Sequence, residues 1–263
     1  MKSQGKVYLV GAGPGDPELL TVRASKLLGR AEVVLHDDLV PAEILALAGP
    51  QAKIVNVGKR CGAKRITQQE INDQLIAAAR GGRTVVRLKS GDPGIFGRLA
   101  EEVDALKAAR VAHEIVPGIT AGMGAAAALG VSLTDRRKAA RVVIISGHKA
   151  HSGEPDEKID WKMLARKDAT LIVYMPGHEF KALQQELLQA GLPSETPAVI
   201  ISRATTREQQ QEFTTIGNLG TVRRLAAPSL LLIGWALEGA SEKSHSESFA
   251  AAAEYAELML ASE

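Results

Sequence analysis

Short apolar runs alternate with amphipathic stretches along the first half of the chain. Runs rich in β-branched residues predict strands, whereas an apolar residue at every third or fourth position predicts a helix. The predicted strands are 6–11, 32–36, 53–57, 84–89 and 113–116, and the predicted helices are 21–28, 41–48, 68–80 and 96–109. Because the strand runs are almost continuously apolar, we expect a parallel sheet that is buried on both faces, with right-handed crossovers.

The pattern changes at Pro117-Gly118 and then resumes. Residues 119–131 are rich in glycine and alanine, which predicts a helix packed very closely on backbone or ligand. The later strands are predicted at 141–146, 169–174, 198–202, 212–216 and 229–234, and the later helices at 161–166, 178–189 and 218–225. We therefore expect two α/β domains with mainly parallel or mixed sheets, at 1–117 and 118–240. Residues 241–263 are expected to form a polar linker and a C-terminal helix or tail.

Composition excludes several kinds of partner. The 263 residues include 45% hydrophobic and 24% charged side chains with a formal net charge of +2, as in an ordinary globular protein. Only 3% of the residues are aromatic, too few for a stacking platform that binds single-stranded nucleic acid. The balanced charge also argues against sequence-independent binding to duplex nucleic acid. We therefore expect no nucleic-acid partner.

The sequence also bears on location. Its single cysteine, Cys61, cannot form an internal disulfide, which favours a reducing compartment. The polar N-terminus lacks the apolar core of a signal peptide, and no apolar run approaches the roughly 20 residues of a membrane span. We expect a cytoplasmic protein that is not in a membrane.

A glycine-rich segment, GAGPGDP at residues 11–17, directly follows the first predicted strand. Its position resembles that of a dinucleotide-binding loop, but Asp16 stands where the third glycine would admit a pyrophosphate. The carboxylate would repel phosphate, and Pro14 lacks the N–H that a phosphate would accept. The segment therefore argues against an NAD site while still marking the strand end where α/β sheets bind ligands.

A second glycine-rich segment, residues 87–98, also links a strand to a helix. Its three glycines permit close approach of backbone, and Asp92 could accept hydrogen bonds from a ribose or an ammonium group. Arg98 and Glu101 are three residues apart and would share a helix face, so an ion pair between them is the simplest interpretation.

Segments 11–17, 88–98 and 117–121 and the dipeptide Tyr174-Met175 occur together, in this order, in the tetrapyrrole (corrin/porphyrin) methylases, which the chain resembles from about residue 6 to 234. The resemblance implies a two-domain homodimeric enzyme that uses S-adenosylmethionine, with its active site in the interdomain cleft. Segments 58–60, 69–72 and 95–98 are most similar to those of family members that act on uroporphyrinogen III.

Such members methylate uroporphyrinogen III twice, through precorrin-1 to precorrin-2, for sirohaem, cobalamin or haem d1 synthesis, and release S-adenosylhomocysteine. Alternatives are a methylase of the same fold that acts on a later corrin intermediate, on diphthamide precursors or on ribosomal RNA. A non-catalytic nucleotide-binding protein is a further alternative.

The resemblance also implies roles for individual residues. The cofactor contacts would be Pro14, Ser90, Gly91, Asp92, Ile95, Thr120, Ala121, Met175 and Ala204. The proton acceptor would be Asp37 and the proton donor Lys59. Asp37 could instead cap the next helix, and Lys59 could instead have a structural role or balance the charge of the substrate. The substrate contacts would be Arg98, Glu101, Arg136 and Met175. Arg98 could also handle protons, but an arginine rarely gives up its proton, which favours binding.

Four positions depart from the residues common in the family: Ser90, Leu99, Asp135 and Pro176. A metal site is not expected. His148 and His151 have a suggestive spacing, but the sequence offers no third ligand beside them.

Overall fold

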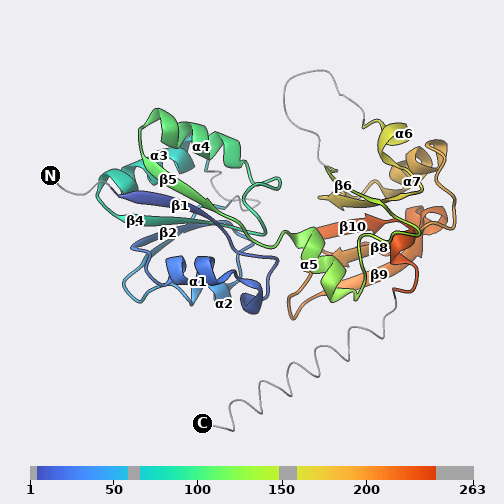
Figure 1. The fold of residues 1–263 in the computed structure, drawn as a ribbon, viewed down its shortest axis with the longest axis horizontal. Helices are drawn as coiled ribbons and strands as arrows, with labels where there is room; N and C mark the ends of the chain where they lie inside the picture. The colour runs from blue at the N-terminus through green and yellow to red at the C-terminus, as the bar shows by residue number, and fades with distance from the viewer. Residues whose placement is uncertain (1–4, 59–65, 148–158, 241–263) are drawn as a thin grey trace, which may run out of the picture. The chain divides into compact units, whose positions relative to one another are not determined.

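The computed structural model describes residues 5–58, 66–147 and 159–240, and the chain divides into two compact units, Met1–Ala121 and Gly122–Glu263 (Figure 1). Each unit is built on one five-stranded sheet. No helix among the described residues is long and apolar enough to span a membrane.

The sheet of the first unit is parallel throughout, as the sequence predicted. Its strands are β1 (Lys6–Gly11), β2 (Val33–His36), β3 (Lys53–Asn56), β4 (Thr84–Lys89) and β5 (Ala112–Val116), in the order β3-β2-β4-β1-β5. Consequently the carboxyl ends of all five strands lie at the same edge of the sheet, which is where open α/β sheets bind ligands.

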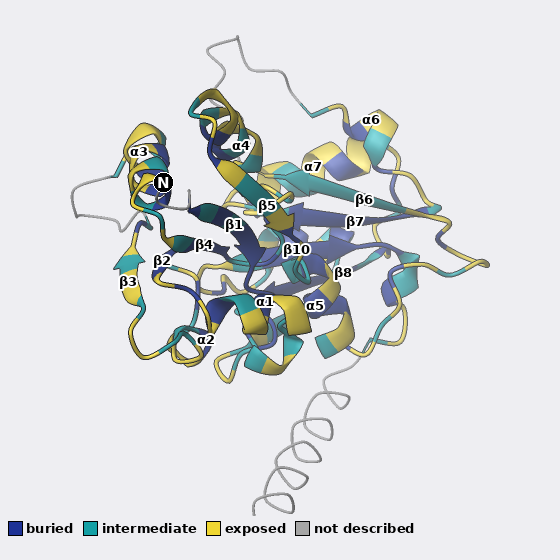
Figure 2. Cartoon of the chain, turned by 60° about the vertical axis from the view of Figure 1, so that its left-hand side comes forward, coloured by how far each residue is buried: buried dark blue, intermediate teal, exposed yellow. Residues whose placement is uncertain are grey.

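Helices cover both faces of this sheet: α1 (Val22–Leu28) and α2 (Ala42–Leu45) lie on one face, and α3 (Gln68–Arg80) and α4 (Leu99–Ala108) lie on the other (Figure 1). Because successive strand residues point to opposite faces, Leu9 packs in the core beneath α3 and α4, while Val10 packs beneath α1 and α2. The buried residues of both cores are mainly valine, leucine and alanine, and Figure 2 shows the central strands mostly buried.

Two helices of this unit show how local signals set their limits. Helix α3 begins after Thr67, whose hydroxyl accepts from Glu70 N at 3.1 Å while the Glu70 carboxylate accepts from Thr67 N at 2.7 Å. Helix α4 begins at Leu99, so the predicted start at residue 96 is wrong. Phe96 and Arg98 have φ angles of 53° and 54°, which no α-helix accommodates.

The sheet of the second unit is mixed. Its strands are β6 (Arg141–Ser146), β7 (Ala169–Tyr174), β10 (Ser229–Ile233), β8 (Pro197–Ser202) and β9 (Gln210–Thr215), in that spatial order. Strands β6 and β7 are parallel, and the remaining neighbours are antiparallel. One face carries α6 (Trp161–Leu164), α7 (Phe180–Gln189) and the 3-10 helix η2 (Ile216–Thr221). The helix predicted at 218–225 is therefore wrong, since a short 3-10 helix precedes an irregular segment there.

The glycine- and alanine-rich segment forms α5 (Ala121–Ala128), and the close packing expected of it is with the sheet. Gly122 N donates to the Tyr174 hydroxyl at 2.7 Å, and a Cβ on Gly122 would lie 2.9 Å from a methyl carbon of Ile172. A larger side chain at position 122 would therefore push α5 away from β7. The remaining short elements are the 3-10 helices η1 (Pro17–Leu19) and η3 (Trp235–Leu237).

Candidate active site

Most of the residues implicated by the sequence follow strands of the first unit. Pro14 follows β1, Asp37 follows β2, Ser90 follows β4 and Thr120 follows β5. Since these strands are parallel, all four residues lie at the carboxyl edge of one sheet. Three loops lie at this edge, residues 11–17, 90–97 and 117–121, and they are called the cofactor loops below.

The cofactor loops touch one another through backbone. Gly13 N donates to Gly91 O at 3.1 Å, and Gly91 N donates to Gly13 O at 2.8 Å. A Cβ on Gly11 would lie 2.6 Å from Gly118 Cα, so glycine is required at this crossing. Loops that are distant in sequence are thereby held in one fixed arrangement.

Asp92 fastens the second and third of these loops together. Its Oδ1 accepts from Gly94 N at 2.8 Å, and its Oδ2 accepts from Gly118 N at 3.0 Å. The sequence suggested Asp92 as an acceptor for a ligand, whereas the structure gives it backbone partners on two loops. Each carboxylate oxygen has a second lone pair, so a ligand hydroxyl or ammonium group can still be accepted.

The chemistry of the cofactor loops fits S-adenosylmethionine, which carries a sulfonium, an ammonium group, ribose hydroxyls and a flat adenine ring. Their only charged side chains are Asp16 and Asp92, and they contain no lysine or arginine. Pro14 and Ile95 expose part of their apolar surface, and Gly91 lies beside Thr120 and Ala121. A cationic ligand with apolar parts suits such surroundings, whereas a phosphate would lack a counter-charge. Asp16 itself caps η1, accepting from Glu18 N at 2.9 Å.

Asp37 does not cap a helix, so that alternative is wrong. The residue that caps α2 is Pro41, which makes no side-chain capping bond. Instead, Asp37 Oδ1 accepts from Arg87 Nη2, and the Asp37 side chain remains 30% exposed. The other candidate for proton transfer, Lys59, lies outside the described residues.

Beneath Asp37 lies a set of buried charges to which sequence reasoning assigned no role. Arg87 and Lys89 on β4 are each 3% exposed, and Glu102 on α4 is fully buried. Glu102 Oε1 accepts from Arg87 Nε and from Lys89 Nζ, both at 3.0 Å. These three residues are called the Glu102 cluster below. The available signal was two charged residues inside an otherwise apolar strand, since buried charges are rare unless they are paired.

Arg98 and Glu101 form the ion pair that their spacing predicted. Arg98 Nε lies 2.7 Å from Glu101 Oε1, and Arg98 Nη2 lies 2.6 Å from Glu101 Oε2. The hydrogen bonds to Glu101 raise the pKa of Arg98 above its usual value, so Arg98 stays charged. Arg98 is the residue that precedes α4 rather than a member of the helix. Both side chains are exposed, so a substrate carboxylate at Arg98 would compete with Glu101.

The candidates of the second unit follow β7 and β8, which both run antiparallel to β10 and therefore end at the same edge of their sheet. Met175 follows β7 with a φ of 49°, and it is exposed. Ala204 follows β8 and is buried between Arg203 and Thr205, whose φ values are 49° and 67°. Non-glycine residues with positive φ are strained and concentrate at functional sites. No sequence pattern announced this strain, because none of the three residue types favours it.

Arg136 is exposed and has no ion-pair partner among the described residues. Its neighbour Arg137 is held by Asp135, with Nε 3.0 Å from Oδ1 and Nη2 2.8 Å from Oδ2. Hydrogen bonds from Arg137 lower the pKa of Asp135 to about 2. Asp135 thus neutralises Arg137 and leaves Arg136 available for an acidic ligand.

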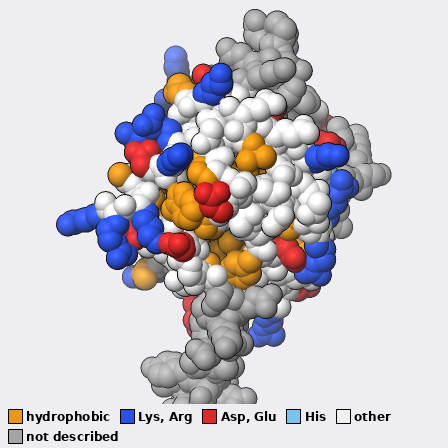
Figure 3. Space-filling view, turned by 90° about the vertical axis from the view of Figure 1, so that its right-hand side faces the viewer, with side chains coloured by type: hydrophobic (Ala, Val, Ile, Leu, Met, Phe, Trp, Pro, Cys, Tyr) orange, Lys and Arg blue, Asp and Glu red, His pale blue; other side chains and the backbone are white. Residues whose placement is uncertain are grey.

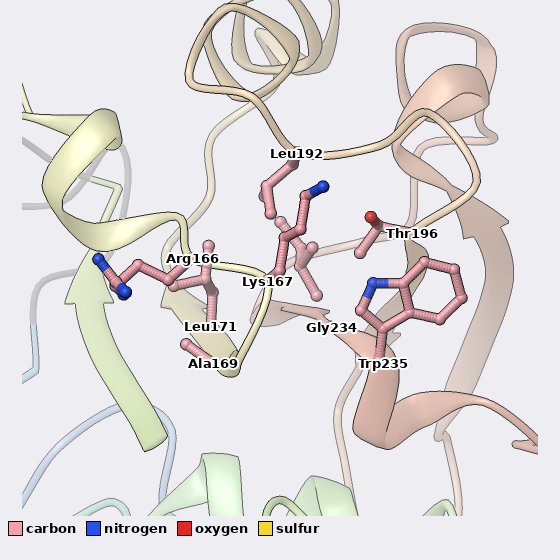
Figure 4. Close-up of a pocket in the computed structure, with 9 residues that line it drawn as sticks. Arg166, Lys167, Ala169, Leu171, Leu192, Thr196, Gly234 and Trp235 are labelled. Carbon is pink, nitrogen blue, oxygen red and sulfur yellow. The ribbon is translucent and has the colours of Figure 1, made fainter. Parts of the chain in front are cut away.

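One depression in the second unit is too small for a ligand. A depression lined by Lys167, Thr196 and Trp235, at the opposite edge of the sheet from Met175, leaves no room for a water molecule (Figure 4). On the face drawn in Figure 3, lysine and arginine side chains of the described residues lie mostly toward the margins.

No group of three or more potential metal ligands occurs within residues 5–58, 66–147 and 159–240. His148 and His151 lie outside those ranges.

Comparison with known proteins gives the family. Residues 6–220 match the model of the Tetrapyrrole (Corrin/Porphyrin) Methylases, so the chain belongs to that family of α/β methylases. The chain is 43% identical, over 89% of its length, to the chloroplastic S-adenosyl-L-methionine-dependent uroporphyrinogen III methyltransferase of Arabidopsis thaliana. It is 45% identical, over 88% of its length, to siroheme synthase 1 of Cronobacter sakazakii. The chain spans 64% of the first of these relatives and 49% of the second.

Solved structures agree with this assignment. The uroporphyrin-III C-methyl transferase of Thermus thermophilus, complexed with S-adenosylhomocysteine, matches 89% of this chain and 93% of its own, with a TM-score of 0.75 and 38% identity. A cobalt precorrin-4 methyltransferase matches 88% of this chain and 95% of its own, with a TM-score of 0.76 and 31% identity. The mixed α/β fold expected from the sequence is thereby confirmed.

Proposed function

We propose that the protein transfers methyl groups from S-adenosylmethionine to two ring carbons of uroporphyrinogen III, through precorrin-1 to precorrin-2. The observation that carries the proposal is the joining of three loops without lysine or arginine at one sheet edge. Backbone hydrogen bonds between Gly13 and Gly91 join the first two loops, and Asp92 joins the second to the third. The relatives named as uroporphyrinogen III methyltransferases support the choice of substrate. The product would feed the synthesis of sirohaem, cobalamin or haem d1.

The cofactor contacts that the family resemblance implies are Pro14, Ser90, Gly91, Asp92, Ile95, Thr120, Ala121, Met175 and Ala204. When bound, S-adenosylmethionine supplies an electrophilic methyl group. Asp92 keeps the loops at the spacing that their backbone hydrogen bonds set and offers its remaining lone pairs to the ligand. Ile95 and Met175 offer apolar surface to the adenosine.

The substrate is a polycarboxylate, which calls for discrete cations rather than aromatic surface. Arg136 is unpaired among the described residues and offers a planar fork that matches a carboxylate. Arg98 is exposed and can exchange Glu101 for a substrate carboxylate. Because the two carboxylates compete for the same guanidinium, Glu101 lowers the affinity of Arg98 for the substrate. Met175, which is exposed, is the remaining substrate contact that the family resemblance implies.

A methylated pyrrole ring must lose a proton, and Asp37 is the acceptor in this proposal. Its side chain is partly exposed at the sheet edge and can pass the proton on to water. Lys59 would act as donor. An acid and a base at one site suit a reaction in which the macrocycle gains positive charge on methylation and loses it with the proton.

We also propose that the protein acts as a homodimer in the cytoplasm. The dimer comes from the family resemblance, and the reducing compartment from the lone Cys61.

The test is anaerobic incubation of the purified protein with uroporphyrinogen III and S-adenosylmethionine, followed by mass spectrometry of the tetrapyrrole. We expect two added methyl groups and two equivalents of S-adenosylhomocysteine. Similarity to the cobalt precorrin-4 methyltransferase makes a later corrin intermediate the second candidate substrate. Transfer to that class alone would favour the second candidate, and cofactor binding without transfer to either would refute both.

A further inference from the structure

The Glu102 cluster places one guanidinium directly behind Asp37. Arg87 and Lys89 carry positive charge, while Glu102 and Asp37 carry negative charge, so the four side chains balance. Burying such charges is costly, and hydrophobic residues of similar volume often stabilise a fold as well or better. Stability alone is therefore a weak explanation for this arrangement.

Every nitrogen of the Arg87 guanidinium has a partner. Nε donates to Glu102 Oε1 at 3.0 Å, Nη1 lies 3.4 Å from Leu35 O and 3.3 Å from Leu88 O, and Nη2 donates to Asp37. These partners come from α4, β2, β4 and the loop after β2. A planar group fixed at three corners cannot turn, so its contact with Asp37 has one geometry.

Glu102 supplies the fixed point behind Arg87. Its Oε1 also accepts from Lys89 Nζ at 3.0 Å and from Gln68 Nε2 at 3.4 Å. Lys89 is two residues from Arg87 and so lies on the same face of β4. Burial, together with the charge of Arg87, lowers the pKa of Lys89. Glu102 sits between two cations that would otherwise repel each other across the strand.

Only one oxygen of Asp37 is used in this contact. Arg87 donates to Oδ1, whereas Oδ2 has no hydrogen-bond partner among the described residues. Once Oδ1 is held by Arg87, the carboxylate cannot rotate about the Cβ–Cγ bond. The direction in which Oδ2 points is therefore fixed as well. That leaves Oδ2 as the atom able to take a proton at the sheet edge.

We propose that Arg87, anchored by Glu102, is a positioning residue that orients the Asp37 carboxylate for proton acceptance. The inference rests on the proposed function. In the step that it serves, a C–H bond of the methylated macrocycle breaks and its electron pair stays in the macrocycle. The proton forms an O–H bond with Asp37 Oδ2 and then leaves to water.

A double-mutant cycle tests this proposal. Asp37→Asn, Arg87→Lys and the double variant are compared with the wild type in kcat, in KM for each substrate and in Kd for S-adenosylhomocysteine. Asp37→Asn is expected to lower kcat by about 10² to 10⁴. Arg87→Lys keeps a cation for Glu102 but loses the fork, and we expect kcat to fall about 10- to 100-fold. Both KM values and the S-adenosylhomocysteine Kd should stay within about twofold of the wild type.

The decisive comparison is the double variant, whose kcat should equal that of Asp37→Asn alone, because Arg87 acts through Asp37. Lys89→Met is the matched control. It removes the other cation on Glu102 without touching Asp37, so its effect should multiply with that of Asp37→Asn. Arg87→Met, which removes the cation as well as the planar group, is made in parallel and should lower kcat at least as much as Arg87→Lys. If Arg87→Met does not fold, Arg87→Lys alone provides the test.

The outcomes separate the two proposals. A wild type without methyl transfer refutes the proposed function, and the positioning role falls with it. If the wild type is active but Arg87→Lys and Asp37→Asn multiply in kcat, only the positioning role is overturned. A loss of S-adenosylhomocysteine affinity that accounts for the whole effect of Arg87→Lys would overturn it as well.

Discussion

Asp92 Oδ2 accepts a hydrogen bond from Gly118 N at 3.0 Å, joining the loop after β4 to the loop after β5. The other oxygen of the same carboxylate accepts from Gly94 N, so one side chain shapes both its own loop and a distant one. Asp92 therefore affects a ligand bound at this edge in two ways. It sets the geometry of the two loops, and its carboxylate can accept a hydrogen bond from the ligand.

Asp92→Ala should therefore weaken cofactor binding and reduce stability together. Hydrogen bonds to a charged acceptor contribute about 1.5–3 kcal/mol each, so we expect S-adenosylhomocysteine affinity to drop at least tenfold and the midpoint of thermal unfolding to fall. Calorimetric titration and thermal unfolding measure the two effects. Asp73→Ala, at an exposed aspartate of α3, is the control and should change neither. An unchanged affinity in Asp92→Ala would remove this residue from the binding site.

Met175 offers a test in which stability and binding should separate. Its φ of 49° favours glycine, so Met175→Gly should be more stable than Met175→Ala by up to about 1 kcal/mol. Both variants remove the exposed thioether and should weaken S-adenosylhomocysteine binding alike. Denaturant unfolding and calorimetry measure the difference. Equal stabilities would show that the strain is negligible, and retained affinity would exclude a cofactor contact.

Arg136 and Arg137 are adjacent arginines with different expected roles. Arg136→Ala should raise KM for the tetrapyrrole about tenfold or more with little change in KM for the cofactor, because it removes an unpaired fork for a carboxylate. Arg137 is already neutralised by Asp135, so Arg137→Ala should leave both constants nearly unchanged. Steady-state kinetics with each substrate varied gives the comparison. A reversed result would place Arg137 at the substrate instead.

Asp135 should titrate abnormally, with a pKa of about 2 set by Arg137. A lowered carboxyl pKa means that the folded state binds fewer protons than the unfolded state, so this contribution to stability is present above the ordinary pKa. It is lost as the pH falls from that ordinary value toward 2. Arg137→Ala removes the side-chain hydrogen bonds but keeps the backbone one, so the pKa of Asp135 should rise in the variant and the carboxyl should protonate at a higher pH than in the wild type. Carboxyl carbon chemical shifts report this directly, and identical titration of the two proteins would contradict the pairing.

Local sequence signals were sufficient where the chain's own neighbours decide the structure. Thr67 and Glu70 make the capping box at the predicted start of α3, and the β-branched runs of β1 and β4 begin and end as predicted. The alternation of strands and helices gave the parallel sheet of the first unit. Parallel strand direction then brought the cofactor loops to one edge without any knowledge of contacts.

Local signals failed where the backbone is held in a conformation that its residues do not favour. The sequence predicted that Phe96 and Arg98 belong to a helix, yet both have positive φ, and α4 begins only at Leu99. The strain at Met175, Arg203 and Thr205 was equally invisible. Such conformations cost free energy locally and persist only because packing elsewhere enforces them.

The sequence by itself determined the α/β class, the family and the loops that carry the candidate chemistry. These depend on residue order, hydrophobic period and glycine placement, all of which are local. Only the tertiary structure decided that Asp37 pairs with Arg87 rather than capping a helix, and that Asp92 joins two loops. Those partners lie 50 and 26 residues away, and a carboxylate takes whichever donors folding brings within about 3 Å.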